Sequence, residues 1–149
     1  MARVSSGVFP CYENQFKINT SATSTASFAT IADCETFECS FDNGVEEWTP
    51  FESEGWTRRL MTAKSVTITV SGKRNIGDTG NDYVSGLTFA NGQDAQSDFQ
   101  WTFPDGTVVT FADAVISVTS NGGGDSTNVG PLEFEVQSNG KPTISTTSN

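Results

Sequence analysis

The chain has 149 residues, no histidine and a net charge of −10, from 18 acidic and 8 basic residues. This length fits one domain that buries its own core without disulfides or metals. The acidic balance disfavours a surface that neutralises many phosphates, and with it tight nucleic-acid binding. Serine and threonine supply about a quarter of the residues, which favours strands and polar loops over packed helices.

The two ends of the chain lack a periodic pattern, so residues 1–10 and 142–149 are expected to be extended arms. The stretch TSATSTASFAT at 20–30 is a flexible connection or a weak edge strand, and the former is favoured. Three cysteines cannot all pair, and neither an apolar signal segment nor a run long enough to cross a bilayer is seen. We expect synthesis in the cytosol with reduced thiols, among which Cys39 is a buried structural thiol.

Alternating polarity predicts strands in three places. In residues 37–41, in SVTITVSG (65–72) and in PLEFEVQS (131–138), apolar side chains alternate with polar ones. That is the period of a strand with one covered face. The run Asp-Asn-Gly at 42–44 is a turn signal, and it predicts the end of the first of these strands.

One segment has helical spacing instead. In residues 81–91 an Asn-Asp pair caps the start, apolar residues recur at three and four, and Asn-Gly ends the pattern. DFQWTFPDGTVVTF (98–111) predicts a hairpin, FADAVISVTS (111–120) another strand, and SNGGGDSTNVG (120–130) a long loop. The whole pattern predicts one all-β domain, a β-sandwich or small barrel with one short α-helix on its flank.

Catalytic and metal sites are not indicated. Without histidine, Ser-His-Asp and Cys-His machinery and histidine metal sites are ruled out. The run GDTGND (77–82) lacks the final bidentate glutamate of an EF-hand loop, and Gly122–Gly124 lacks the lysine of a phosphate loop. We therefore predict no enzymatic activity and no bound metal or cofactor.

The segment VEEWTPFESEGWTRRL (45–60) is unusual for so acidic a chain. Trp48, Phe51 and Trp56 flank Pro50 without a clean period of two. Loop tryptophans usually mark contact surfaces, because burying them against a partner gains a large apolar area. The alternative is a satellite cluster folded back on the domain.

The chain resembles the major tail proteins, or tail tube proteins, of long-tailed, non-contractile bacteriophages over VEEWTPFESEGWTRRLMTAKSVTITVSGKRNIGDTGNDYVSGL (45–87). The features that carry the resemblance are Glu-Glu-Trp-Thr-Pro, Glu-Gly-Trp followed by Arg-Arg-Leu-Met-Thr, the Lys-Ser-Val-Thr-Ile strand, and Gly-Lys-Arg-Asn before Gly-Asp-Thr-Gly-Asn-Asp-Tyr-Val. A looser likeness continues through DGTVVTF (105–111) and PLEFEVQSNGKP (131–142), so it covers nearly the whole chain from Ile31.

The resemblance implies hexameric rings that stack into a hollow tube through which DNA leaves. In this family a long β-hairpin loop projects onto neighbouring subunits and the next ring, and residues 43–60 match that loop. Its tryptophans are expected to anchor one subunit on another, and its acidic and arginine pairs to set the register. The residues assigned to this assembly loop are Glu46, Glu47, Trp48, Pro50, Phe51, Trp56, Arg58 and Arg59.

The implied partners are other copies of the chain, a tape measure protein inside the tube, the tail terminator and distal tail or baseplate proteins. Double-stranded DNA is expected to pass through without tight binding, because a bore lined with carboxylates repels phosphates. Glu38, Glu133 and Glu135, on the polar faces of two predicted strands, are the candidate bore-lining acids. The implied location is the virion, after synthesis in the bacterial host cytoplasm.

Two other interpretations stay open. A carbohydrate-binding or adhesion β-sandwich holds sugars with surface Trp, Asp and Asn side chains, and it predicts a monomer that binds glycans. A tube subunit of a contractile tail, or of a phage-derived particle, shares the fold and differs by its sheath partner.

Overall fold

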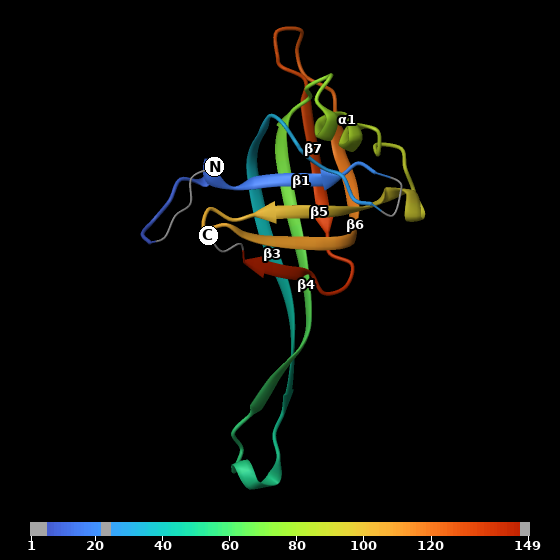
Figure 1. Ribbon diagram of the computed structural model, residues 1–149. Helices are drawn as coiled ribbons and strands as arrows, with labels where there is room; N and C mark the ends of the chain where they lie inside the picture. The colour runs from blue at the N-terminus through green and yellow to red at the C-terminus, as the bar shows by residue number, and fades with distance from the viewer. Residues whose placement is uncertain (1–5, 22–24, 147–149) are drawn as a thin grey trace.

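The computed structural model describes residues 6–21 and 25–146, which form eight strands and one α-helix (Figure 1). The strands are β1 (Gln15–Asn19), β2 (Phe28–Thr30), β3 (Cys34–Trp48), β4 (Arg58–Lys73), β5 (Gln96–Thr102), β6 (Thr107–Asn121), β7 (Pro131–Gln137) and β8 (Thr143–Thr146). The helix α1 spans Thr79–Ser85, and three short 3-10 helices are η1 (Cys11–Glu13), η2 (Phe51–Ser53) and η3 (Gly92–Ala95). The prediction of an all-β fold with one short α-helix is confirmed.

The eight strands form one antiparallel sheet that folds on itself. Their order is β2-β1-β5-β6-β7-β4-β3, and β8 also pairs with β6. The first half of β6 pairs with β5 and β8, whereas its second half pairs with β7. In Figure 1, β1, β5, β8 and the start of β6 form a first layer that runs across a second layer of β3, β4 and β7. This is the arrangement of an orthogonal β-sandwich, in which bent strands make the corners.

The corner in β6 lies at Asp113. There Ala112 and Asp113 together face Asp98 of β5, which is a β-bulge. Asp113 has a left-handed φ of 52°, and its N–H donates to the Asp98 carboxylate at 3.0 Å. Its carbonyl oxygen accepts from the Asn139 amide at 3.1 Å. These bonds stabilise the bend that allows β6 to belong to both layers.

The core fills the space between the layers with aliphatic and aromatic side chains. Its members from the strands are Phe16, Ile18, Ile68, Val70, Phe99, Val109, Phe111, Ala114, Ile116, Leu132, Phe134 and Val136. Phe16 and Phe37 meet edge to face with ring centroids 4.9 Å apart, a favoured aromatic geometry. Cys39 packs against this core but is only partly buried, and burial raises the pKa of its thiol.

The helix begins earlier and is shorter than predicted, Thr79–Ser85 rather than 81–91. Asp78 caps it, because its carboxylate accepts from the N–H groups of Asn81 at 3.0 Å and Ala32 at 3.1 Å. The cap therefore lies three residues before the predicted Asn-Asp pair, and the glycine that follows α1 ends it. The helix packs against β2 and β6 (Figure 1).

Asn81 is buried and joins three segments through its amide group. Its Nδ2 donates to the carbonyl oxygens of Ala32 at 3.1 Å and Lys73 at 2.9 Å. Its Oδ1 accepts from the Asn75 N–H at 3.0 Å and the Arg74 guanidinium at 2.9 Å. The network fixes α1 against the end of β4 and the connection before β3.

Two predicted strand boundaries are wrong. The Asp-Asn-Gly run at 42–44 does not turn the chain, since β3 continues to Trp48. Gly44 pairs with Ala63 of β4, where a Cβ on the glycine would lie 2.9 Å from the Ala63 Cβ. Long-range pairing therefore overrules a local turn signal. Residues 111–120 are not a separate strand but the continuation of β6 around the corner.

The chain ends also differ from prediction. Thr143–Thr146, within the predicted C-terminal tail 142–149, form β8 and pair with Thr107–Thr110. Residues 6–10 of the predicted N-terminal arm are exposed and carry no strand, while 1–5 and 147–149 lie outside the described residues. In the stretch 20–30, Phe28–Thr30 form the edge strand β2, so the favoured flexible connection is wrong there.

Candidate assembly surface

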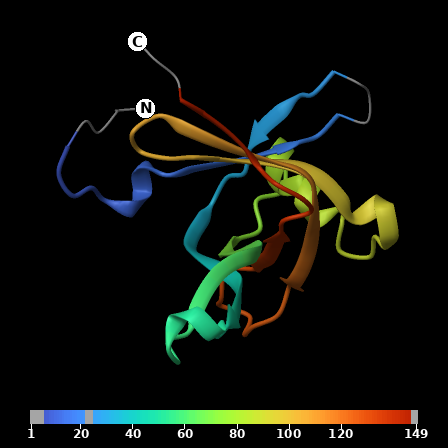
Figure 2. The same ribbon diagram turned by 90° about the horizontal axis from the view of Figure 1, so that it is seen from below.

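Strands β3 and β4 run on beyond the sandwich as a projecting hairpin, defined here as residues 42–65 (Figure 1). Figure 2 looks up this hairpin from its tip. None of its residues is buried. The paired stem extends from Asp42 opposite Ser65 to Trp48 opposite Arg58, so only residues 49–57 form the tip. Half of the predicted hairpin loop at 43–60 is thus paired strand and half is tip, and the hairpin reaches five residues farther along β4.

The stem has two different faces. Beyond a register shift after Gly44, the pairing and the alternation of side chains place Val45, Glu47, Arg59 and Met61 on one face and Glu46, Trp48, Arg58 and Leu60 on the other. On the first, the Glu47 face, Arg59 Nε donates to the Glu47 carboxylate at 3.0 Å. On the second, the Trp48 face, the Arg58 guanidinium lies 5.7 Å from the centre of the Trp48 ring, within cation–π range.

The tip is ordered by its own hydrogen bonds. The Ser53 hydroxyl lies 2.9 Å from the Pro50 carbonyl oxygen and 2.7 Å from that of Trp56, and the Trp56 N–H donates to the Ser53 carbonyl at 3.0 Å. Yet the Phe51 side chain is fully exposed and Trp56 is 80% exposed. Because these bonds already order the tip, binding a partner through its aromatic rings would cost little conformational entropy. An ordered tip with exposed aromatic rings is typical of a contact surface.

All eight residues assigned to the assembly loop lie on the projecting hairpin. The structure brings four of them together as Glu47 with Arg59 and Trp48 with Arg58. The other four, Glu46, Pro50, Phe51 and Trp56, form no ion pair or ring contact within the described part of the chain. The sequence predicts acidic and arginine pairs that act between subunits, whereas Glu47 and Arg59 are already paired inside one hairpin.

Sequence reasoning missed the apolar side chains along the strands of the hairpin. Phe41, at the base of the hairpin, and Val45, Leu60 and Met61 within it are exposed, although Phe41 alternates with polar residues as in a half-buried strand. Local alternation carries no signal of where strands leave the sandwich, because it depends only on neighbours along the chain. Which apolar side chains of β3 and β4 are covered depends on how far the first layer extends over these strands.

The three candidate bore-lining acids share one face of the second layer. Glu38 lies opposite Thr69, Thr69 lies opposite Glu135, and Glu133 lies opposite Ser71. Their neighbours along β3 and β7 point towards the core, so the three carboxylates point outward. The face is polar and carries negative charge across adjacent strands.

The described residues contain no group of three or more His, Cys, Asp or Glu side chains placed to hold a metal ion. Burial, with the charges of Asp33 and Asp78, raises the pKa of Cys34 to about 12. Such a thiol is protonated at neutral pH, which removes its nucleophilic character. No helix in the described ranges is long and apolar enough to cross a membrane.

No protein-family model matches the sequence, and no curated protein matches it. The fold is similar to a chain in the tail of an empty gene transfer agent particle with C6 symmetry, at a TM-score of 0.69 and 22% identity over 95% of this chain and 100% of that one. A chain of the virion of a native gene transfer agent particle gives a TM-score of 0.70 and 22% identity, over 93% of this chain and 99% of that one. A chain of the sheath–tube complex of an extracellular contractile injection system, in its extended state, is similar at a TM-score of 0.65 and 12% identity. The match covers 96% of this chain and 95% of that one. These likenesses show a shared fold.

Proposed function

We propose that the chain is a non-enzymatic structural subunit of a tail tube, which assembles into hexameric rings stacked as a hollow conduit in a virion. The observation that carries the proposal is the match of the fold, over nearly the full length of both chains, to a chain in a tail with C6 symmetry. The sequence of residues 45–87 also resembles tail tube proteins. Both lead to the same class of assembly.

In this proposal the projecting hairpin packs on neighbouring copies. Trp48, Phe51 and Trp56 supply the apolar area, and burying an aromatic anchor of this kind contributes about 2 kcal/mol or more to an interface. Arg58 and Glu46 on the Trp48 face offer charges that no carboxylate or cation of the described chain neutralises. They favour one register of the neighbouring copy over others.

The acidic outer face of the second layer lines the bore. Glu38, Glu133 and Glu135 then face the phosphates of double-stranded DNA and repel them, so DNA slides without tight binding. A tape measure protein occupies the bore before DNA does, and a tail terminator and distal tail or baseplate proteins close the two ends. The resemblance to tail tube proteins implies these partners.

A non-contractile tail is the first candidate, on the sequence resemblance. A contractile tail is the second, because a similar chain belongs to the sheath–tube complex of a contractile injection system. The two differ by a sheath around the tube. Particles purified from the producing cells and separated by mass would contain a stoichiometric sheath protein only in the second case.

The experiment that tests the tube proposal is light scattering with sedimentation velocity over a wide range of protein concentration. We expect a mass that grows in multiples of six subunits. A variant with residues 45–61 replaced by Asn-Gly should keep its far-UV circular dichroism and stay monomeric, whereas a variant with 123–128 of the glycine-rich loop replaced in the same way should assemble. A wild-type chain that is monomeric at every concentration and binds glycans would instead support the carbohydrate-binding module.

A further inference from the structure

A groove of about 420 Å³ opens between η1, the start of β1 and the start of β3. Phe16, Ile31 and Phe37 supply much of its apolar lining. Asp33 and Glu35 bring two carboxylates to the same groove, and both residues are exposed. The groove is therefore apolar with an acidic edge.

The two carboxylates of the groove have different partners. Glu35 pairs with Lys73 Nζ at 3.2 Å. Asp33 accepts from the Asn75 side-chain amide at 2.7 Å and forms no ion pair within the described ranges. No lysine or arginine of the described chain lines the groove, so its edge keeps a negative charge. Because the chain carries 18 acidic residues against 8 basic ones, few of its segments complement such an edge.

The start of the chain is one of these segments. Its first ten residues carry Arg3 and no acidic side chain, and they lead directly into η1, one wall of the groove. In the described part of this arm, Val8 is fully exposed and Phe9 is 49% exposed. The residues before it, Met-Ala-Arg-Val-Ser, join apolar side chains to one cation. They match the groove in polarity and in charge.

The groove lies within reach of these residues. The arm bends at residues 6–7, where Gly7 has a φ of 88°, a conformation that glycine adopts without steric cost. From Val4 to Cys11, which lines the groove, seven residues span up to ~23 Å at about 3.3 Å per residue. A tether this short gives an effective concentration on the order of millimolar, so a weak contact is enough to fill the groove.

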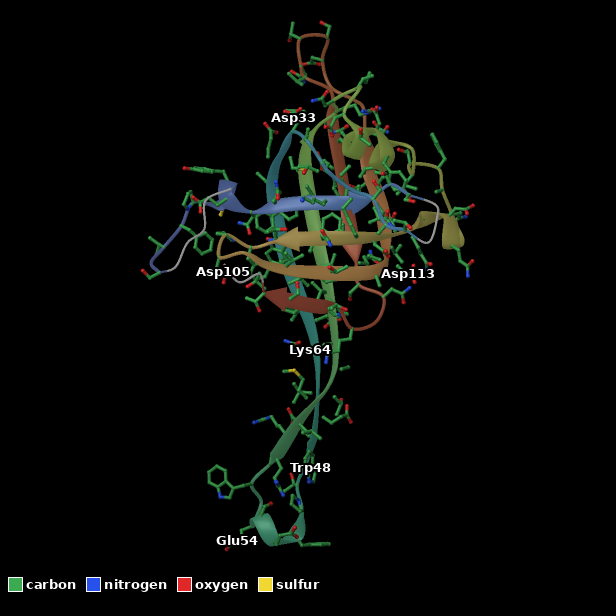
Figure 3. All side chains as sticks on the ribbon, in the orientation of Figure 1. Asp33, Trp48, Glu54, Lys64, Asp105 and Asp113 are labelled. Atoms are coloured by element: carbon green, nitrogen blue, oxygen red, sulfur yellow. The ribbon has the colours of Figure 1, made fainter. Side chains whose placement is uncertain are left out.

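We propose that residues 1–5 fold back into the groove of their own chain, with Val4 against its aromatic rings and Arg3 facing Asp33. Figure 3 shows Asp33 at the end of the molecule opposite Glu54 of the hairpin tip, so the hairpin of the same chain lies away from this site. A groove filled in this way is closed to apolar segments of other copies. The contact forms within one subunit and does not depend on the proposed tube.

The test places one thiol on the arm and one on the β3 wall of the groove. Val4→Cys is combined with Thr36→Cys, since Thr36 lines the groove, in a Cys11→Ser background. A short bismaleimide should link positions 4 and 36, with the joined peptides identified by mass spectrometry. The control replaces Thr36→Cys by Thr102→Cys, because Thr102 pairs with Gln15 at the start of β1 but does not line the groove. Its link to position 4 should be much weaker.

The charge of the arm gives a second control. Adding Arg3→Glu should lower the yield of the link between positions 4 and 36 about tenfold, the effect of losing one charge-assisted contact, and leave the link to position 102 unchanged. Adding Arg3→Lys should keep most of the yield. Far-UV circular dichroism checks that each variant is folded.

Mixing equal amounts of ¹⁵N-labelled and unlabelled protein before linking shows which chain supplies the arm. Joined peptides that carry a single isotope support the contact within one chain. Joined peptides of mixed isotopes would place the arm in the groove of a second copy and overturn the proposal. Equal yields at positions 36 and 102, or a yield that Arg3→Glu does not lower, would overturn it as well, whether or not the protein forms tubes.

Discussion

Arg59 Nε donates to the Glu47 carboxylate at 3.0 Å across the stem of the projecting hairpin, with the two side chains 62% and 55% exposed. Water screens a pair this exposed, so it contributes roughly 0–1 kcal/mol to the free energy of unfolding. The pair therefore matters more for the charge pattern of the Glu47 face than for stability. In the proposed tube, a second subunit would meet the arrangement of charge that this pair fixes on the Glu47 face.

Arg59→Glu reverses one of these charges and places like charges against each other in the stem. We expect the free energy of unfolding to change by less than about 1 kcal/mol, while polymerisation weakens because the neighbouring copy meets the wrong charge. Urea unfolding and pelleting of assembled material measure the two effects. Arg59→Lys is the control that keeps the charge. Tubes of normal length and yield from Arg59→Glu would show that the pair plays no part in assembly.

Trp48→Ala removes the aromatic anchor of the Trp48 face without touching the core, since Trp48 is 43% exposed. The loss of a buried anchor costs about 2 kcal/mol or more per interface, which should raise the critical concentration for assembly more than tenfold, at about 1.4 kcal/mol per tenfold change. Light scattering against concentration measures it. Phe89→Ala, at an exposed phenylalanine outside the hairpin, should assemble normally, and equal losses in both variants would contradict the assignment.

Asn81→Ala removes the amide that joins α1, β4 and the connection before β3. We expect the free energy of unfolding to fall by about 3 kcal/mol, because each buried polar group left without a partner costs about 1–3 kcal/mol. Guanidinium unfolding followed by tryptophan fluorescence measures the change. Asn91→Ala, at an exposed position without a side-chain cap bond, should change it by less than about 0.5 kcal/mol. Similar values for both variants would mean that the Asn81 network does not hold the fold together.

The Arg74 guanidinium beside Asp82, with the Gly77 N–H, lowers the pKa of that carboxyl from its ordinary 3.8. A carboxyl with a depressed folded-state pKa stabilises the fold above its unfolded pKa and loses this contribution as the pH falls through the folded value. Asp82→Asn should therefore lower the melting temperature at neutral pH and make its decline below pH 3.8 shallower. Asp94→Asn, at an exposed carboxyl, is the control that removes one negative charge elsewhere on the surface. A slope that Asp82→Asn does not alter would contradict this role of the Arg74 pair.

The candidate bore-lining acids give a prediction about DNA. Changing Glu38, Glu133 and Glu135 together to lysine should make tubes that retain double-stranded DNA at low salt and release it as salt rises, because the phosphates now find cations. In particles, genome ejection should slow or stop. The triple glutamine variant separates loss of repulsion from gain of attraction and should retain far less DNA. Unchanged ejection and infectivity in the lysine variant would remove the idea of a repulsive lining.

Local periodicity predicted the strands whose alternation is long and whose covered face is apolar. Residues 65–72 lie in β4 as expected, and of the predicted strand 131–138 all but the last residue lie in β7. The Pro-Asp-Gly run correctly predicted the turn between β5 and β6. β1 was missed, and an edge strand at β2 was only the less favoured alternative, because the two strands are only five and three residues long. Pairing with β5, distant in the sequence, holds β1 in place. Short strands of this kind are fixed by tertiary pairing rather than by their own composition.

The composition of residues 45–60 predicted a contact surface, but it did not predict which side chains share each face of the hairpin. That Arg59 meets Glu47 while Arg58 meets Trp48 depends on the register of β3 and β4 and on the shift after Gly44. A shift of one residue would exchange these side chains between faces. The groove between η1, β1 and β3 escaped sequence analysis for a similar reason, because its walls meet only in the folded chain.

Negative-stain electron microscopy of the purified protein, concentrated at low and moderate salt, tests the tube most directly. The account predicts rings with six-fold views that stack into hollow tubes. Only isolated particles of monomer size, under every condition and with the hairpin intact, would contradict it.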